Sequence, residues 1–196
     1  MTPSPSILDP SETPLFLDTS VLINLIATNQ AEAILAALAR PIYVEAYVAK
    51  ELLRDPRDGS DGQLTLRKLV HSGYLRLVAM TPTQVEHFLG LVGAPFPDDL
   101  GDGEAATIAA ALGVGYIALD ESKANRVVTQ KHPTLRVYSS LDLFCSSKVI
   151  AALGGNVVAV AVQSAITVGR MRVPHSWRAW VNSFIVAKAV STSALG

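Results

Sequence analysis

Short apolar runs that alternate with helical stretches fill residues 15–150 of this 196-residue chain. We predict five strands, separated by helical segments throughout, at 15–17, 42–44, 74–78, 116–119 and 135–138. Strands that alternate with helices form a mostly parallel sheet covered on both faces, because parallel neighbours need a crossover connection. The chain is therefore expected to be an α/β protein and, at this length, a single domain.

The sequence divides into three consecutive parts, residues 1–14, 15–150 and 151–196. Residues 1–14 contain four prolines, no basic residue and no apolar segment, so we expect a flexible extension and not a secretory signal. Residues 15–150 carry the alternation of strands and helices and are expected to form the main domain. Because no targeting signal is visible, we expect a cytoplasmic protein.

The third part, residues 151–196, begins beside the pair Gly154-Gly155. Its apolar stretch at 157–168 is shorter than the ~20 residues of a membrane-spanning helix, so we expect a buried or interface helix and no membrane association. An apolar surface of this kind favours a homodimer or a docked protein partner. The tail beyond it, which is expected to pack on the main domain or on that partner, holds three large aromatic residues, Trp177, Trp180 and Phe184.

Charge is divided unevenly along the chain. Residues 1–120 hold 7 Lys and Arg against 15 Asp and Glu, whereas residues 121–196 hold 9 against 2. An acidic part suits a metal ion, and a basic part suits a polyanion. The single Cys145 excludes a disulfide framework and a multi-cysteine zinc site, and we expect a small buried side chain there. The four histidines have no ligand spacing, which also argues against zinc.

Four carboxylates stand at the ends or edges of the expected elements. Asp18 and Asp120 each follow an apolar strand, and Glu51 and Glu104 lie in helical segments. The carboxyl ends of parallel strands meet at one crevice, where four carboxylates repel one another unless a hard cation such as Mg²⁺ or Mn²⁺ joins them. The pattern favours a metal-dependent hydrolase. Singly, each residue also fits a simpler role, as a helix cap, a first-turn acid or part of an exposed helix face.

Four strings, in this order, carry a family resemblance: Phe16-Leu17-Asp18-Thr19-Ser20-Val21-Leu22-Ile23, Val48-Ala49-Lys50-Glu51-Leu52, Gly103-Glu104-Ala105-Ala106-Thr107-Ile108-Ala109, and Ile117-Ala118-Leu119-Asp120-Glu121-Ser122-Lys123-Ala124. Together they resemble the PIN-domain ribonucleases, and within that family the prokaryotic branch related to VapC-type toxins. The resemblance covers roughly residues 15–150, with a weaker likeness as far as Val168.

The resemblance implies a three-layer α/β/α sandwich around a central, mostly parallel five-stranded sheet. It also implies a metal-dependent endoribonuclease that hydrolyses RNA phosphodiester bonds with one or two Mg²⁺ or Mn²⁺ ions and acts as a toxin restrained by an antitoxin protein. The implied catalytic and metal-binding carboxylates are Asp18, Glu51, Glu104 and Asp120. The residues expected to meet the RNA substrate are Thr19 and Ser20, through their hydroxyls, and Lys123 and Arg126.

Some positions depart from the family pattern and leave alternatives open. Ala118 and Leu119 stand where family members often have a Thr or Ser before the fourth acidic residue. Asp102 is an alternative third metal ligand to Glu104, and Glu121 is adjacent to Asp120 and is a candidate to share its role. Two other functions remain: a catalytically silent PIN-fold module that binds RNA or a partner, and a nuclease acting on structured DNA.

Other enzyme classes fit the sequence less well. Ser20 occupies the position at which a phosphatase of the haloacid-dehalogenase type needs a second Asp. The first strand is followed by Asp-Thr-Ser-Val and not by a glycine-rich loop that cradles phosphates. These features exclude the best-known phosphate-binding signatures at the first strand.

Overall fold

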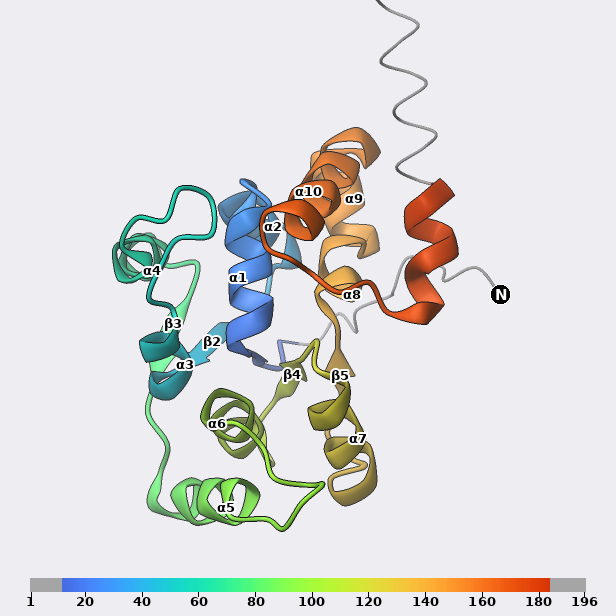
Figure 1. Ribbon diagram of the computed structural model, residues 1–196. Helices are drawn as coiled ribbons and strands as arrows, with labels where there is room; N and C mark the ends of the chain where they lie inside the picture. Colours follow the sequence, from blue (N-terminus) through green and yellow to red (C-terminus); the bar gives the residue numbers. More distant parts are fainter. Residues whose placement is uncertain (1–11, 184–196) are drawn as a thin grey trace, which may run out of the picture.

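The computed structural model of the protein describes residues 12–183 (Figure 1). Most of the predicted extension at 1–14, and Phe184 with the rest of the tail, lie outside the described residues. Five parallel strands form one sheet in the order β3-β2-β1-β4-β5, and helices cover both of its faces. The expected α/β sandwich is confirmed, and within the described residues every strand pair is parallel.

The strands are short, with bounds β1 (Leu15–Leu17), β2 (Ile42–Glu45), β3 (Arg76–Val78), β4 (Tyr116–Ala118) and β5 (Val137–Tyr138). Strand β3 begins later than the predicted 74–78 because the N–H groups of Tyr74 and Leu75 both donate to the Leu69 carbonyl, at 3.0 and 3.3 Å. They close the end of the preceding helix. The beginning of β5 is delayed in the same way, because Leu135 N–H donates to His132.

Strand order places a switch point at the centre of the sheet. From β1 the chain moves outward through β2 and β3, and then returns to the other side of β1 for β4 and β5. In open α/β sheets, ligands bind outside the carboxyl ends of the strands at such a point. The crevice between the ends of β1 and β4 is therefore the place to look for a functional site.

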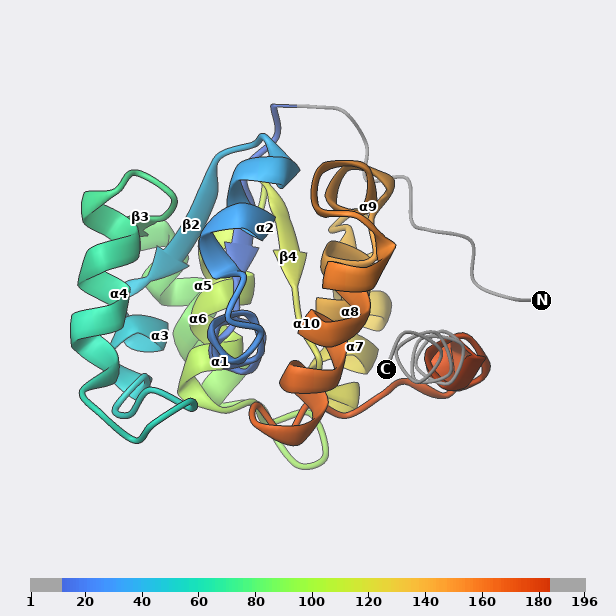
Figure 2. The same cartoon turned by 90° about the horizontal axis from the view of Figure 1, so that it is seen from above.

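The helices form two layers and one flank (Figures 1 and 2). One layer holds α1 (Thr19–Ala27), α2 (Ala31–Leu38), α8 (Ser140–Phe144), α9 (Ser147–Leu153) and α10 (Gly155–Thr167). The opposite layer holds α5 (Pro82–Val92), α6 (Asp102–Ala111) and α7 (Ser122–Lys131). The helices at the β2–β3 edge are α3 (Ala46–Glu51) and α4 (Gly62–His71).

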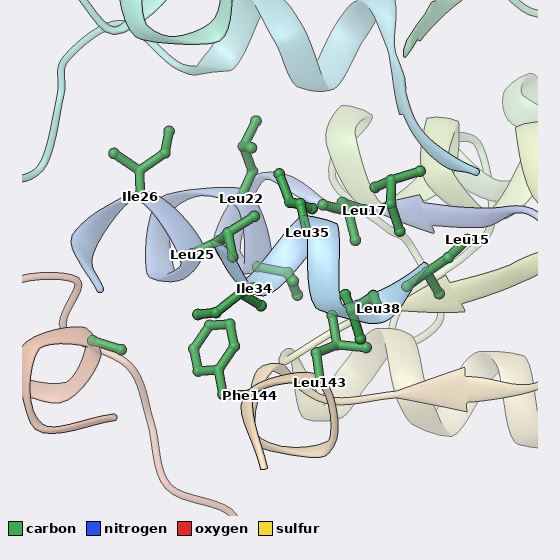
Figure 3. Packing of buried hydrophobic residues seen from close by; sticks show 14 of the residues in the cluster. Leu15, Leu17, Leu22, Leu25, Ile26, Ile34, Leu35, Leu38, Leu143 and Phe144 are labelled. Carbon is green, nitrogen blue, oxygen red and sulfur yellow. The ribbon is translucent and has the colours of Figure 1, made fainter. Parts of the chain in front are cut away.

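Alternate strand residues divide the interior into two cores. Leu15 and Leu17 enter the core on the α1 side, where Figure 3 shows them beside leucines of α1 and α2. Phe16 points the other way, into the core built around α6, and stacks on Tyr43 with ring centroids 5.3 Å apart. Because strand side chains alternate between faces, each strand contributes to both layers. Each buried leucine contributes about 1.5–3 kcal/mol, so even three-residue strands are held firmly.

The predicted helix from Leu141 to about Ile150 is wrong in one respect, since it is divided into α8 and α9. Ser146 is buried between them and caps α9, accepting a hydrogen bond from Val149 N–H at 3.4 Å. The preceding Cys145 is fully buried, and burial raises the pKa of its thiol. The prediction of a small buried side chain at Cys145 is confirmed.

After α10 the chain returns to the body of the protein. Residues 175–183 are helical, and Trp177 and Val181 of this helix are buried in the α1-side core. Within residues 12–183, a helix long and apolar enough to cross a membrane alone is not found; the pairs α1–α2 and α9–α10 reach that length only together and are bent by 117° and 112°.

Candidate active site

Asp18 lies at the switch point, directly after β1. Its backbone N–H donates to the Ala118 carbonyl of β4 at 3.2 Å, which ties the residue to both central strands. Its carboxylate accepts hydrogen bonds from the N–H and the hydroxyl of Ser20, at 3.2 and 2.7 Å, and caps α1. The helix begins at Thr19, directly after this cap. Asp18 is therefore both a helix cap and a carboxylate held at the crevice.

Burial raises the pKa of Asp18 to about 6, against the lowering effect of its bonds to Ser20, and the charge of Glu104 raises it further. Only 3% of the residue is exposed. The comparably buried Asp55 differs because Arg57 lies 2.6 Å from its carboxylate, and the hydrogen bonds from Arg57 hold its pKa well below the usual range. Asp55 is thus neutralised within the fold, whereas the charge of Asp18 is not.

Glu51 is the last residue of α3 and reaches across to the beginning of α6. Its carboxylate accepts hydrogen bonds from Thr19 Oγ1 and from Gly103 N–H, the latter at 3.1 Å. A Cβ atom at position 103 would overlap Glu51 Oε2. The absence of a side chain at Gly103 therefore allows the Glu51 carboxylate to lie directly on α6.

Glu104 is half-buried in the first turn of α6 and accepts a hydrogen bond from Gly101 N–H at 3.1 Å. Burial raises its pKa, and the neighbouring charges of Glu121 and Glu51 add to the increase. Asp18, Glu51 and Glu104 thus lie along one edge of the sheet, which is called the carboxylate edge below. Asp102, the alternative ligand, is exposed in the same turn of α6.

Asp120 follows β4 but is bound into the α1 layer. It accepts hydrogen bonds from Ser140 N–H at 2.8 Å, from Ser140 Oγ at 2.6 Å and from Asn24 Nδ2 at 2.7 Å. Burial raises its pKa, and these bonds oppose the increase. The neighbouring Glu121 faces the other way, toward Glu104 and Arg172, and its oxygen lies 3.9 Å from the Arg172 guanidinium.

Asn24 and Ser140 are the residues of this site that sequence reasoning missed. Asn24 is the one polar side chain between Val21 and Ala27, and a single amide in an apolar helix is the signal that could have found it. Ser140 is the first residue of α8 and is not its cap. Ser139 takes that role by accepting from Asp142 N–H at 3.2 Å, which leaves Ser140 to bind Asp120.

Replacing the buried Ser140 with alanine is expected to lower the free energy of unfolding at pH 7 by about 1–3 kcal/mol, because the half-buried Asp120 carboxylate loses a donor. The loss should shrink at acidic pH, where Asp120 is protonated. Urea unfolding at both pH values measures the change. Thr167→Ala, which removes an exposed hydroxyl bonded to the Gln163 carbonyl, serves as the control and is expected to stay within about 0.5 kcal/mol. An equal effect of the two variants would contradict the role of Ser140.

The two basic residues predicted to contact RNA are both paired with acidic residues of the 93–101 loop. Arg126 lies 2.7 Å from Asp98 and also donates to the Pro97 carbonyl at 2.9 Å. Lys123 lies 3.7 Å from Asp99. These pairs tie α7 to the loop, so binding of an RNA phosphate by either residue would compete with them.

The carboxylates fit a hard divalent cation in chemistry. Asp18 and Glu104 both offer carboxylate oxygens, the ligands that such a cation prefers. Burial and neighbouring carboxylates disfavour the charged form of both residues, and a bound cation would favour it. Among residues 12–183, however, three or more His, Cys, Asp or Glu side chains are not gathered closely enough to hold a metal ion. Glu51 is turned to Thr19 and Asp120 to Ser140, which accounts for the separation.

Comparison with protein families identifies most of the α/β part of the chain. A family model described as a PIN domain matches residues 15–149, which run from β1 into α9. The searches of curated proteins and of solved structures each found no match. The matched region contains all the carboxylates described above and ends before α10.

Proposed function

The chain belongs to the PIN-domain family, and from this premise we propose that it is a metal-dependent endoribonuclease that hydrolyses RNA phosphodiester bonds. PIN domains are typically nucleases. The observation that carries the proposal is the carboxylate of Asp18, which is buried at the switch point with its pKa raised and Glu104 nearby. A fold gains no stability from such a charge, so a ligand that neutralises it is the simplest reason for its presence.

We propose that Asp18, Glu51, Glu104 and Asp120 hold Mg²⁺ or Mn²⁺, with Asp102 as the alternative to Glu104 and Glu121 sharing the role of Asp120. When bound, such an ion activates water as a nucleophile and neutralises charge that develops on the phosphate. Thr19 and Ser20 hold the carboxylates of Glu51 and Asp18 in place through their hydroxyls. Both hydroxyls, together with Lys123 and Arg126, are also proposed to meet the RNA backbone.

The finer biological role is proposed from the resemblance of the four sequence strings to VapC-type toxins. In that role the protein is a cytoplasmic toxin restrained by an antitoxin protein. Support for a protein partner, or for a homodimer, comes from α10 and the residue after it, on which Val157, Val160 and Val168 are 39%, 67% and 40% exposed. Light scattering over a range of concentrations tests the dimer, and a constant monomeric mass would contradict it.

The second candidate is a catalytically silent module that binds RNA or a partner. It is favoured by the separation of the carboxylates, since the described side chains do not form a group that holds a metal ion. The two candidates differ in whether a cation draws these carboxylates together.

The deciding experiment is cleavage of a mixed RNA pool by the purified protein with Mn²⁺, with Mg²⁺ and with EDTA. The nuclease is expected to cut with either metal and to stop in EDTA. A folded protein that binds the RNA without cutting it under any of these conditions would favour the silent module. Cleavage that persists in EDTA would contradict the role of the cation.

A further inference from the structure

A pocket of about 440 Å³ lies at the end of β4 and shares Asp120 and Glu121 with the candidate active site. One wall comes from the end of β4 and the beginning of α7, with Asp120, Glu121 and Ser122. The other wall comes from the chain after α10, with Arg172, His175 and Arg178. This second wall lies outside residues 15–149, the part of the chain that matches the PIN domain.

Apolar anchors hold the second wall in place. Met171 is buried, and its N–H donates to the Ala165 carbonyl of α10 at 2.9 Å. Trp177 and Val181 are 5% and 4% exposed and, four residues apart, form the buried side of the last described helix. Arg172 and Arg178 are exposed between and beside these anchors. The buried side chains of Met171, Trp177 and Val181, and not ion pairs, therefore hold the backbone that carries both arginines in place.

The Arg172 side chain is open to a ligand. It is 86% exposed, and its ion pair with Glu121 is long at 3.9 Å. Exposed pairs of this kind contribute little to stability, so exchange of Glu121 for another anion costs little. A guanidinium offers paired N–H donors that match a phosphate, which is the anion that the proposed substrate carries at every nucleotide.

The negative charge of the carboxylate edge opposes the binding of a nucleic acid, so basic residues near it would assist binding. Asp18, Glu104 and Glu121 repel a polyanion, and a bound divalent cation offsets only part of this charge. A nucleic acid that binds across the carboxylate edge therefore needs positively charged side chains next to that edge. Resting on the proposed function, we propose that Arg172 and Arg178 bind the backbone of single-stranded RNA, at a phosphate next to the one that is cleaved.

The test is RNA binding by the full chain that carries Asp18→Asn, so that the substrate stays intact. Fluorescence anisotropy with a labelled single-stranded 12-nucleotide RNA gives the Kd over a series of salt concentrations. Adding Arg172→Gln and Arg178→Gln together is expected to weaken binding about tenfold. The slope of log Kd against log salt should fall by about 0.7 for each phosphate that the arginines no longer neutralise. Arg172→Lys with Arg178→Lys should keep the slope but regain only part of the affinity.

The control is Arg67→Gln on α4. Arg67 is also exposed and paired with one carboxylate, Asp61 at 3.4 Å, but it lies at the β2–β3 edge of the sheet. It is expected to leave the Kd and the salt slope unchanged. In the active protein, the double Gln variant should raise the KM for RNA and leave kcat nearly unchanged.

Three results would overturn the proposal, and they separate it from the nuclease itself. If the wild type cleaves RNA and the double Gln variant binds as tightly as its parent, the wall does not contact the substrate and the nuclease stands. If the double Gln variant loses binding to an acidic peptide but not to RNA, the pocket serves a protein partner. If the wild type neither cuts nor binds RNA, the wall and the proposed function fail together.

Discussion

Replacing Asp18 with asparagine is expected to lower RNA cleavage by about 10³-fold or more while leaving the fold intact. Asparagine has the same shape and also caps helices well, so α1 keeps its beginning. The substitution removes the negative charge of Asp18, which the proposed cation needs at the carboxylate edge. Cleavage rates with Mn²⁺, measured beside circular dichroism of both proteins, check the expectation. Activity close to the wild type would remove Asp18 from the catalytic set.

The same variant is expected to be more stable than the wild type when metal is absent. The pKa of Asp18 is about 6 in the folded protein and 3.8 ordinarily, so between these values the folded state binds more protons than the unfolded state. The free energy of unfolding therefore falls as the pH rises from about 4 to about 6. At 1.36 kcal/mol per pKa unit, the buried carboxylate costs roughly 3 kcal/mol at pH 7. Urea unfolding in EDTA should show Asp18→Asn more stable by up to about that amount at pH 7, with the difference shrinking near pH 4.

Asp55→Asn is the matched control for this stability change, because Asp55 is equally buried but paired with Arg57. Its pKa is lowered, so its stabilising effect is present at pH 7 and is lost as the pH falls. Asparagine at position 55 is therefore expected to destabilise the protein at pH 7, the opposite sign to position 18. A loss of stability at pH 7 in both variants would contradict the view that Asp18 carries an uncompensated charge.

Gly103→Ala is expected to lower cleavage on the order of 10²-fold with little change in stability. The added Cβ would overlap Glu51 Oε2 and lie 3.0 Å from Thr19 Oγ1, so the Glu51 carboxylate must leave its place on α6. Glu51 is exposed at the end of α3 and swings into solvent at low cost, and alanine favours the helix by about 0.5–1 kcal/mol. Misplacement of a catalytic group by about 1 Å is enough for a loss of this size. Cleavage kinetics and thermal unfolding measure the two effects.

Gly90→Ala on α5 is the control for this substitution. A Cβ at position 90 meets nothing within 4 Å, so alanine there is expected to stabilise the protein by about 0.4–1 kcal/mol and to leave cleavage unchanged. Equal activity of Gly103→Ala and Gly90→Ala would show that the position of Glu51 on α6 is irrelevant to the reaction.

Local patterns predicted the strands and the place of Asp18 because both depend on neighbours in the sequence. The apolar run 15–17 is expected to be buried whichever strands it pairs with, and an acidic residue directly after it lies at the carboxyl end of that strand. The division between α8 and α9 could not be predicted, since Ser146 caps a helix only because packing buries it there. Likewise, the bonds that turn Asp120 toward Ser140 and Asn24 depend on contacts between distant segments. A local pattern can single out Asn24, but it does not indicate which distant residue Asn24 or Asp120 contacts.

Those distant contacts also decide when in its synthesis the protein becomes able to act. Asn24 and Asp120 are 96 residues apart, and Asn24 and Ser140 are 116 apart, so the carboxylate edge is incomplete until β4 and α8 have both left the ribosome. A chain made only as far as α6 already contains Asp18, Glu51 and Glu104, but it lacks the Ala118 carbonyl of β4 that binds the Asp18 N–H. Under the proposed function, cleavage is therefore expected to begin only once the chain has been made as far as α8.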